Sequence, residues 1–244
     1  MHTSEYFNIN QSEDVHFFYR GLTDLMCRFA NKYFSSRRPL VILDAGCGTG
    51  AISKHLLLFG DIRGVDFDPN AVSIASSKGI KSVLGDICAL PYPDCYFDAV
   101  ICTDVIYHKA VDPQKALSEL HRVLKPGGIL LLRVPAFDFL FRAHDVHVHT
   151  ARRFTMKSVR NILGAVDFEI VRISYVSLWL FPLSLMMSVA YRLGGKVNEK
   201  SSVRTLHPLL NLFFLQIQIL ENRLLQYVSL PIGQGVIAVA RKGI

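Results

Sequence analysis

Short apolar runs alternate with segments of helical periodicity through residues 40–135. Apolar runs of this length are typical of strands, and strands that alternate with helices form a parallel sheet covered on both faces. The predicted strands cover residues 40–44, 62–66, 81–85, 97–103 and 129–135, and the predicted helices cover 50–59, 70–77 and 113–124. The pattern therefore predicts an α/β fold with a doubly wound, mostly parallel sheet.

Helical and strand patterns continue on both sides of this region. Apolar side chains recur at helical spacing near the N-terminus, and a predicted helix at 155–164 and strand at 167–175 follow the alternating region. The run 235–240 is a predicted last strand. The sequence thus divides into an N-terminal helical extension at 1–38, a core at 39–175 and 229–244, and an apolar insertion at 176–228.

The insertion begins with an apolar run that carries no charge from residue 175 to 191. A membrane-spanning helix needs about 20 apolar residues, and this run is shorter and contains Pro182. A second predicted helix at 208–227 carries Glu221 and Arg223, which do not suit a span. Three interpretations of 176–228 stay open. We favour an amphipathic helical pair that caps the substrate pocket, ahead of peripheral membrane contact with a lipid-like acceptor and of a homodimer interface.

Composition narrows the classes of function. The chain has 244 residues, 50% of them apolar, which suits one α/β domain with an insertion. A net charge of +7 is compatible with an ordinary basic enzyme, a nucleic-acid partner or an anionic membrane surface. Nucleic-acid binders cluster Lys and Arg with aromatic residues between them, whereas here the basic residues are scattered in pairs such as Arg152-Arg153. We therefore expect no nucleic-acid partner.

Cysteine usage and the N-terminus bear on location. The five cysteines include no C-x-x-C pair, and the polar N-terminus shows no apolar signal segment. We therefore expect a cytoplasmic protein with free thiols and no structural zinc. If it associates with a membrane, we expect that at the cytoplasmic face.

The strongest chemical signal lies where the first predicted strand ends. Asp44 precedes Gly46-Cys-Gly48-Thr-Gly50, and a predicted helix follows. The glycines allow a sharp turn and close approach of a ligand, and the helix N-terminus offers free N–H groups. This arrangement predicts a nucleotide-type cofactor at the carboxyl ends of the strands. The G-x-G-x-G spacing differs from the G-x-G-x-x-G of dinucleotide enzymes, and Asp44 would repel a pyrophosphate but can serve a cationic amino-acid group.

Two further acidic residues follow the next two predicted strands. Asp66 ends the second strand, where a carboxylate can accept both hydroxyls of a ribose. Asp86 follows the third strand, where it can accept a hydrogen bond from an adenine amino group, with Phe67 and Ile87 packed on the ring. A single aspartate at a strand end is usually a cap or turn residue, but three in succession indicate a ligand site.

Residues 39–136 resemble class I S-adenosylmethionine-dependent methyltransferases. The matching pieces are Leu43-Asp-Ala-Gly-Cys-Gly-Thr-Gly50, Gly64-Val-Asp66, Gly85-Asp86, Phe97-Asp-Ala-Val100 and Arg122-Val-Leu-Lys-Pro-Gly-Gly128. The resemblance implies a seven-stranded sheet with a final antiparallel strand. It also implies that the glycine loop, including Cys47, holds the methionine end of S-adenosylmethionine, and that Thr103 opens onto the cofactor. Ribose and adenine contacts then fall to Asp66 and Asp86.

The flanking segments resemble one bacterial and archaeal branch of these enzymes, whose members often accompany glycan, lipid or natural-product pathways. The matches are Glu13-Asp-Val-His16-Phe-Phe-Tyr-Arg20, similar to an E-x-x-H-W-W-F/Y-R opening, and His144-Asp145 with His149-x-x-Arg152-Arg153-Phe-Thr155, similar to an HD…H-x-x-RRYT segment. Two departures bear on function. The usual second arginine is absent after Arg20, and the usual D-V-L-E-H is Asp104-Val-Ile-Tyr107-His108, which changes the acceptor side of the pocket.

Methyl transfer is an in-line displacement at a carbon bound to a sulfonium, and the protein mainly orients the reactants. A hydroxyl or carboxyl acceptor benefits from a base of near-neutral pKa, for which histidine is the usual choice. We predict His149 as this base, with His144 and Asp145 as further catalytic candidates, because the loop after the fifth strand should overhang the methyl group. The equal alternative is that the loop only folds over the core, and the histidine spacing fits no metal motif.

Four flanking residues have weaker predictions. His16 and Arg20 belong to a helix that can close over the cofactor, where Arg20 either meets the cofactor carboxylate or forms a surface ion pair. Arg152 and Arg153 either bind an anionic group of the acceptor or mark a solvated helix start.

The sequence therefore predicts methyl transfer from S-adenosylmethionine to a small-molecule, lipid-linked or glycan-linked acceptor, at oxygen rather than at nitrogen or carbon. Two other classes stay open. One is a non-catalytic relative that binds the cofactor as a regulator or scaffold. The other is a nicotinamide oxidoreductase, against which the loop spacing and Asp44 argue.

Overall fold

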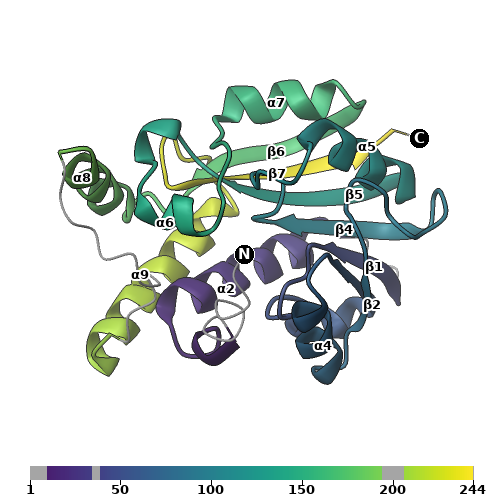
Figure 1. The fold of residues 1–244 in the computed structure, drawn as a ribbon, viewed down its shortest axis with the longest axis horizontal. Coiled ribbons are helices and arrows are strands. Elements are labelled where there is room, and N and C mark those ends of the chain that lie inside the picture. Colours follow the sequence, from purple (N-terminus) through teal and green to yellow (C-terminus); the bar gives the residue numbers. More distant parts are fainter. Residues whose placement is uncertain (1–9, 35–38, 194–205, 244) are drawn as a thin grey trace.

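The computed structural model describes residues 10–34, 39–193 and 206–243. Its strands are β1 (Leu40–Ala45), β2 (Gly60–Asp66), β3 (Lys81–Leu84), β4 (Phe97–Thr103), β5 (Leu124–Pro135), β6 (Phe168–Val176) and β7 (Gly235–Lys242). They form one sheet in the order β3-β2-β1-β4-β5-β7-β6 (Figure 1). β1 to β5 are parallel, whereas β7 runs antiparallel to both of its neighbours. The predicted doubly wound, mostly parallel fold is confirmed.

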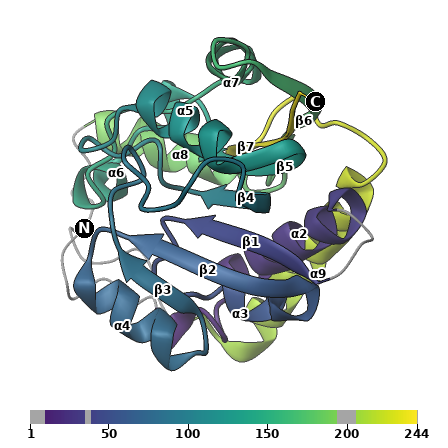
Figure 2. The same cartoon turned by 90° about the vertical axis from the view of Figure 1, so that its right-hand side faces the viewer.

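The helical elements are α2 (Phe17–Tyr33), α3 (Ser53–Leu56), η1 (Leu57–Phe59), α4 (Pro69–Ser77), α5 (Pro113–Val123), η2 (Asp138–Leu140), α6 (Ala143–His147), α7 (Met156–Gly164), α8 (Phe181–Arg192) and α9 (Pro208–Leu225). Figure 2 shows α2, α3 and α9 on one side of the sheet and α5 and α7 on the other. Asp68 and Asp112 cap α4 and α5, and each accepts hydrogen bonds from two backbone N–H groups.

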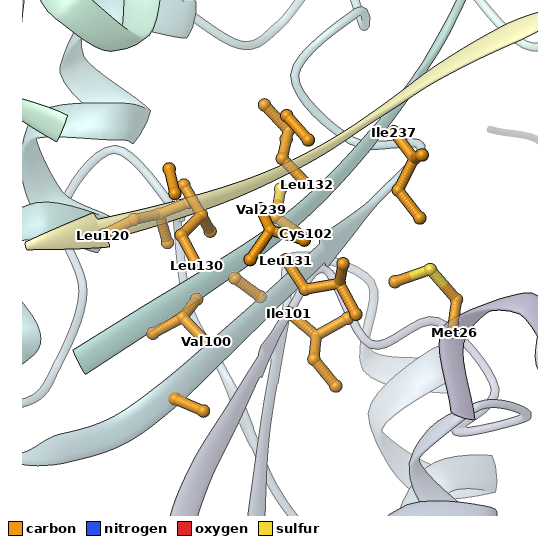
Figure 3. Packing of buried hydrophobic residues seen from close by; sticks show 14 of the residues in the cluster. Met26, Val100, Ile101, Cys102, Leu120, Leu130, Leu131, Leu132, Ile237 and Val239 are labelled. Carbon is orange, nitrogen blue, oxygen red and sulfur yellow. The ribbon is translucent and has the colours of Figure 1, made fainter. Parts of the chain in front are cut away.

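The main core lies between the central strands and the helices on both faces. Figure 3 shows Ile101, Leu131 and Val239 of three neighbouring strands together with Leu120 of α5 and Met26 of α2. All five side chains are almost completely buried. Burial of one large apolar side chain contributes about 1.5–3 kcal/mol. The N-terminal helix is therefore an integral part of the fold.

Several predicted boundaries need correction. β5 begins at Leu124, which pairs with Phe97, and the following residues bulge out of the ladder before Ile129 pairs with Ala99. The glycine-rich segment predicted as a stop is this bulge, with Gly127 at φ +75°. The helix predicted at 50–59 is two short pieces, α3 and η1. Of the extension predicted at 1–38, residues 1–9 and 35–38 lie outside the described residues.

The two helices of the insertion have different principal partners. α8 packs on η2, whereas α9 packs along α2. Asn222 of α9 donates from Nδ2 to the Gly21 carbonyl at 2.8 Å and to Asp24 Oδ2 at 2.9 Å. Among the described residues, none of the helices combines the length and the apolar character that crossing a bilayer requires.

Candidate cofactor and acceptor site

The glycine loop follows β1 at the carboxyl edge of the sheet. The N–H groups of Gly46 and Cys47 donate to the Val65 carbonyl of β2 at 2.7 and 3.0 Å, which ties the loop to the neighbouring strand. Gly46 has φ +79°, and a Cβ there would lie 2.3 Å from the Val105 side chain. Gly48 also has a positive φ, +51°, but a Cβ there would meet no atom of the described residues within 4 Å. The loop is therefore packed on one side and open at Gly48, which leaves a cradle for a ligand.

The third glycine of the loop is a packing residue. Gly50 has φ +74°, and a Cβ there would lie 3.2 Å from the Cβ of Ala75 in α4. Cys47, between the first two glycines, is also buried, and its Sγ would lie only 2.7 Å from a Cβ at Gly64. These contacts fix the distance between the glycine loop and the sheet.

Two of the predicted carboxylates are buried at the loop. Asp44 accepts a hydrogen bond from the Ser53 hydroxyl at 2.6 Å, and burial raises the pKa of Asp44 to about 6 against the effect of that bond. Asp66 accepts from the Gly48 N–H at 2.8 Å and from the Asp68 N–H at 3.0 Å, and burial raises its pKa as well. Burial disfavours the charged form of both groups. A cationic or hydrogen-bond-donating ligand at the loop would therefore stabilise both carboxylates.

The ends of β2 and β3 carry the predicted adenine contacts. Phe67, directly after β2, is 62% exposed, whereas Ile87 is buried. Asp86 is exposed after β3, and the Gly85 N–H donates to the Asp66 carbonyl at 2.9 Å, which holds the two strand ends together. An exposed aromatic ring between two carboxylates offers a stacking face to a nucleobase.

Polar atoms without a partner gather at the carboxyl ends of β4 and β5. In the described part of the chain, Thr103 Oγ1, Asp104 Oδ1 and Arg133 Nε are buried and have no hydrogen-bond partner. Asp104 pairs with Arg133 through its other oxygen and has φ +57°. An unpaired buried polar atom costs about 1–3 kcal/mol. Sequence reasoning selected Thr103 but not Arg133, although Arg133 is the only charge in the apolar run 129–135.

This set of residues fits S-adenosylmethionine. The ammonium, ribose hydroxyls and adenine amino group of that molecule are hydrogen-bond donors, and the loop edge presents the acceptors of Asp44, Asp66 and Asp86. The unpaired oxygens of Thr103 and Asp104 are acceptors as well. A pyrophosphate would instead meet buried carboxylates of its own charge at the glycine loop.

The N-terminal segment closes against the glycine loop. Glu13 is buried, accepts a hydrogen bond from the Thr49 hydroxyl, and pairs with Lys78 and with Lys54, the latter at 3.6 Å. Sequence reasoning did not select Glu13 as a site residue, although it is the first residue of the E-x-x-H opening. A contact between Glu13 and Thr49 places that opening directly on the loop.

The other residues of the opening have different positions. His16 caps α2, where its Nδ1 accepts from the Phe18 N–H at 3.3 Å, and burial lowers the pKa of His16. Arg20 borders a hollow that Asp24 and His55 also line. The predicted contact of Arg20 with a cofactor carboxylate stays a prediction.

A buried ion pair holds the loop that follows β5. Arg153 donates to the two oxygens of Asp145 at 2.9 and 3.0 Å, and the Arg142 N–H donates to the same carboxylate at 3.0 Å. Arg153 also donates to the Ala136 carbonyl at 3.0 Å. Asp145 and Arg153 are thus engaged with each other in the loop, and the roles predicted for them in catalysis and acceptor binding stay predictions. Arg152, their neighbour, is half-buried.

The loop histidines lie beside the segment that follows β4. His149 is exposed with φ +55°, and its carbonyl accepts from the Lys109 N–H at 3.0 Å, which joins the two segments into one wall. Burial lowers the pKa of His108, the residue before Lys109. His144 and His147 are half-buried on α6. Within the described ranges, no three His, Cys, Asp or Glu side chains are grouped to hold a metal.

Comparison with known proteins agrees with this geometry. Residues 43–132 match the family model described as a methyltransferase domain. The malonyl-[acyl-carrier protein] O-methyltransferase 1 of Coxiella burnetii is 32% identical over 142 residues, which are 55% of this chain and 49% of that protein. The tRNA (carboxymethyluridine(34)-5-O)-methyltransferase of Arabidopsis thaliana is 40% identical over 102 residues, which are 40% of this chain and 24% of that protein. The chain thus spans half or less of the length of these relatives.

A solved structure extends the likeness to the whole fold. A SAM-dependent methyltransferase from Thermotoga maritima has a TM-score of 0.59 at 19% identity, over 98% of this chain and 95% of that one. The chain therefore has the fold of S-adenosylmethionine-dependent methyltransferases, and its residues 43–132 are similar to a methyltransferase domain.

Proposed function

We propose that this protein transfers a methyl group from S-adenosylmethionine to an oxygen atom of a small-molecule, lipid-linked or glycan-linked acceptor. The observation that supports S-adenosylmethionine as the methyl donor is the open cradle at Gly48. Buried Asp44 and Asp66 border this cradle, and the unpaired oxygens of Thr103 and Asp104 lie at the ends of the same sheet.

The chain's own residues have separable tasks in this reaction. S-adenosylmethionine, when bound, supplies an electrophilic methyl group on a positively charged sulfur. Asp44 and Asp66 favour that positive charge and orient the donor, since both are buried carboxylates that lack a lysine or arginine partner among the described residues. The loop held by Asp145 and Arg153 follows β5 at the carboxyl edge, where it would restrict water around the donor.

The part of the proposal that concerns the acceptor rests on the wall that the loop after β5 forms with the segment after β4. His149 is exposed on this wall and is our proposed base, which takes the proton of an acceptor hydroxyl as the oxygen–carbon bond forms. One relative is named for O-methylation of an acyl-carrier-linked malonyl group and another for methylation of a tRNA. Scattered basic residues support the small or carrier-linked acceptor over RNA.

A binding and turnover experiment tests the proposal. Calorimetric titration with S-adenosylmethionine and, separately, with NAD identifies the ligand class. We expect S-adenosylmethionine to bind and NAD not to bind, and binding of NAD alone would contradict the proposal. Formation of S-adenosylhomocysteine in the presence of hydroxyl- and carboxyl-bearing acceptors then measures turnover. Tight cofactor binding without turnover on any acceptor class would favour a regulator or scaffold instead.

A further inference from the structure

Helix α8 turns its polar side inward and its apolar side to the outside. Ser184 and Ser188 are buried, and the Ser188 hydroxyl donates to the Phe139 carbonyl at 2.6 Å, while Gln234 donates to the Ser184 hydroxyl. A helix on the surface of a soluble protein normally has the opposite arrangement. The exposed large apolar side chains on α8 are Leu183, Leu185, Met186, Met187 and Val189.

Helix α9 also directs polar side chains inward, beside the buried Leu215 and Leu225. Gln218 accepts from the Trp179 indole at 3.0 Å, and Asn211 accepts from the Phe17 N–H at 2.8 Å. Asn222, as described above, contacts Gly21 and Asp24. The exposed apolar side chains on α9 are Leu209, Leu210, Leu212, Phe213, Leu220 and Leu224.

The two helices lie at the same end of the molecule, at the left of Figure 1. We call the exposed apolar side chains on α8 and α9 the outer apolar surface. Single exposed leucines are common, but soluble monomers rarely expose contiguous apolar patches of more than a few hundred Å². The inward contacts of the two helices are made by other side chains, namely the serines and amides together with buried leucines such as Leu215 and Leu225. The arrangement of the two helices therefore suits contact with an apolar phase outside the protein.

The charged residues on α8 and α9 favour a lipid surface over a second copy of the chain as the partner of the outer apolar surface. The exposed charged residues on the two helices are Arg192 and Arg223. Their only acidic residue, Glu221, turns inward and accepts from the N–H groups of Ser177 at 2.5 Å and Trp179 at 3.3 Å. A symmetric dimer through this surface would place arginines against two helices that, as described, offer them no exposed carboxylate. Anionic lipid headgroups would supply the missing negative charge.

We propose that the outer apolar surface docks on an anionic lipid bilayer, with α8 and α9 lying in the interface rather than crossing it. Interfacial helices bury an apolar face at the boundary of headgroups and acyl chains and gain from basic residues beside it. α8 also packs on η2 at the start of the loop over the site. Docking would therefore hold that loop beside the membrane.

Vesicle binding tests this proposal independently of methyl transfer. The purified full chain is sedimented with vesicles of phosphatidylcholine alone or mixed with phosphatidylglycerol, without cofactor. We expect binding to the mixed vesicles that weakens with salt and is weaker on neutral vesicles. Combined Met186→Glu and Phe213→Glu substitutions should abolish it. Leu58→Glu is the matched control, because Leu58 is 72% exposed but lies in η1, outside the surface.

A charge variant refines the test. Arg223→Gln should weaken binding about fivefold on anionic vesicles, the equivalent of about 1 kcal/mol for one basic residue near the surface, and leave binding to neutral vesicles unchanged. Failure of the wild-type chain to bind mixed vesicles, or equal losses in the Met186→Glu/Phe213→Glu and Leu58→Glu proteins, would overturn the proposal. A concentration-dependent dimer that Phe213→Glu dissociates, without vesicle binding, would assign the surface to a second copy. An unchanged urea-denaturation midpoint in each variant shows that it is folded and keeps this result separate from the proposed function.

Discussion

Replacement of Gly48 by alanine separates backbone conformation from open space in the glycine loop. Gly48 has φ +51°, and a Cβ there would meet no protein atom within 4 Å. The left-handed conformation costs an alanine about 1–2 kcal/mol, and no clash inside the protein adds to that cost. We therefore expect Gly48→Ala to lower the free energy of unfolding by about 1–2 kcal/mol, measured by urea denaturation.

The added methyl group also occupies the proposed cradle for the cofactor. We expect the affinity for S-adenosylmethionine, measured by isothermal titration calorimetry, to fall at least about tenfold, which is about 1.4 kcal/mol. Gly127→Ala is the matched control. Gly127 has φ +75°, and a Cβ there would also meet no atom within 4 Å, but it lies in the β5 bulge away from the carboxyl edge. This variant should lose the same stability and keep the wild-type affinity.

The comparison has two outcomes that would refute the reasoning. Wild-type affinity in Gly48→Ala would show that the cofactor does not approach this part of the loop. Equal loss of affinity in Gly48→Ala and Gly127→Ala would show that binding responds to global stability and not to the cradle. Gly46→Ala cannot replace either variant, because its Cβ would lie 2.3 Å from Val105 and unfolding would confound the binding measurement.

Three further predictions address the buried acids and the proposed base. Burial raises the pKa of Asp44 to about 6, so the folded chain binds this proton more tightly than the unfolded chain, and this group's contribution to stability is lost as pH rises from about 4 to about 6. Urea titrations across this pH range should show that the free energy of unfolding of the wild type falls by at most about 3 kcal/mol relative to that of Asp44→Asn. Parallel pH dependences in the two proteins would refute the raised pKa of Asp44. Asp145→Ala should cost about 3–5 kcal/mol of stability, because it leaves the Arg153 guanidinium buried and unpaired; a loss below about 1 kcal/mol would mean that the pair does not hold the loop. His149→Asn should lower kcat about 10²–10⁴-fold at unchanged S-adenosylmethionine affinity, since asparagine tolerates the φ of +55° while removing the base. His147→Asn should keep the wild-type rate, and equal losses in both variants would point to the shape of the loop instead.

The donor side of the site was predictable from sequence because its parts are local. Each proposed contact lies at a strand end, and the ends of parallel strands meet at one edge of a sheet. Asp44, Asp66 and Asp86 could therefore be placed near one another once the strands had been recognised. The structure confirms the strands, with differences of a few residues at the boundaries.

The parts of the site that join distant segments were less predictable. The pairing of Asp104 with Arg133 joins two strands, and the contact of Glu13 with Thr49 joins the N-terminal segment to the glycine loop. A motif locates such residues but does not indicate which partner each will have. This explains why Asp145 was predicted as a catalytic candidate, although the fold engages it with Arg153.

The position of β7 between β5 and β6 has a consequence for synthesis on the ribosome. Among the described strands, β6 pairs only with β7, so β6 stays unpaired until residues 177–242 have been translated. Long-range antiparallel pairing of this kind closes late and slowly. Helices α8 and α9 emerge during that interval, with their leucines and methionines already unprotected. We expect the nascent chain to meet chaperones or lipid before its sheet is complete.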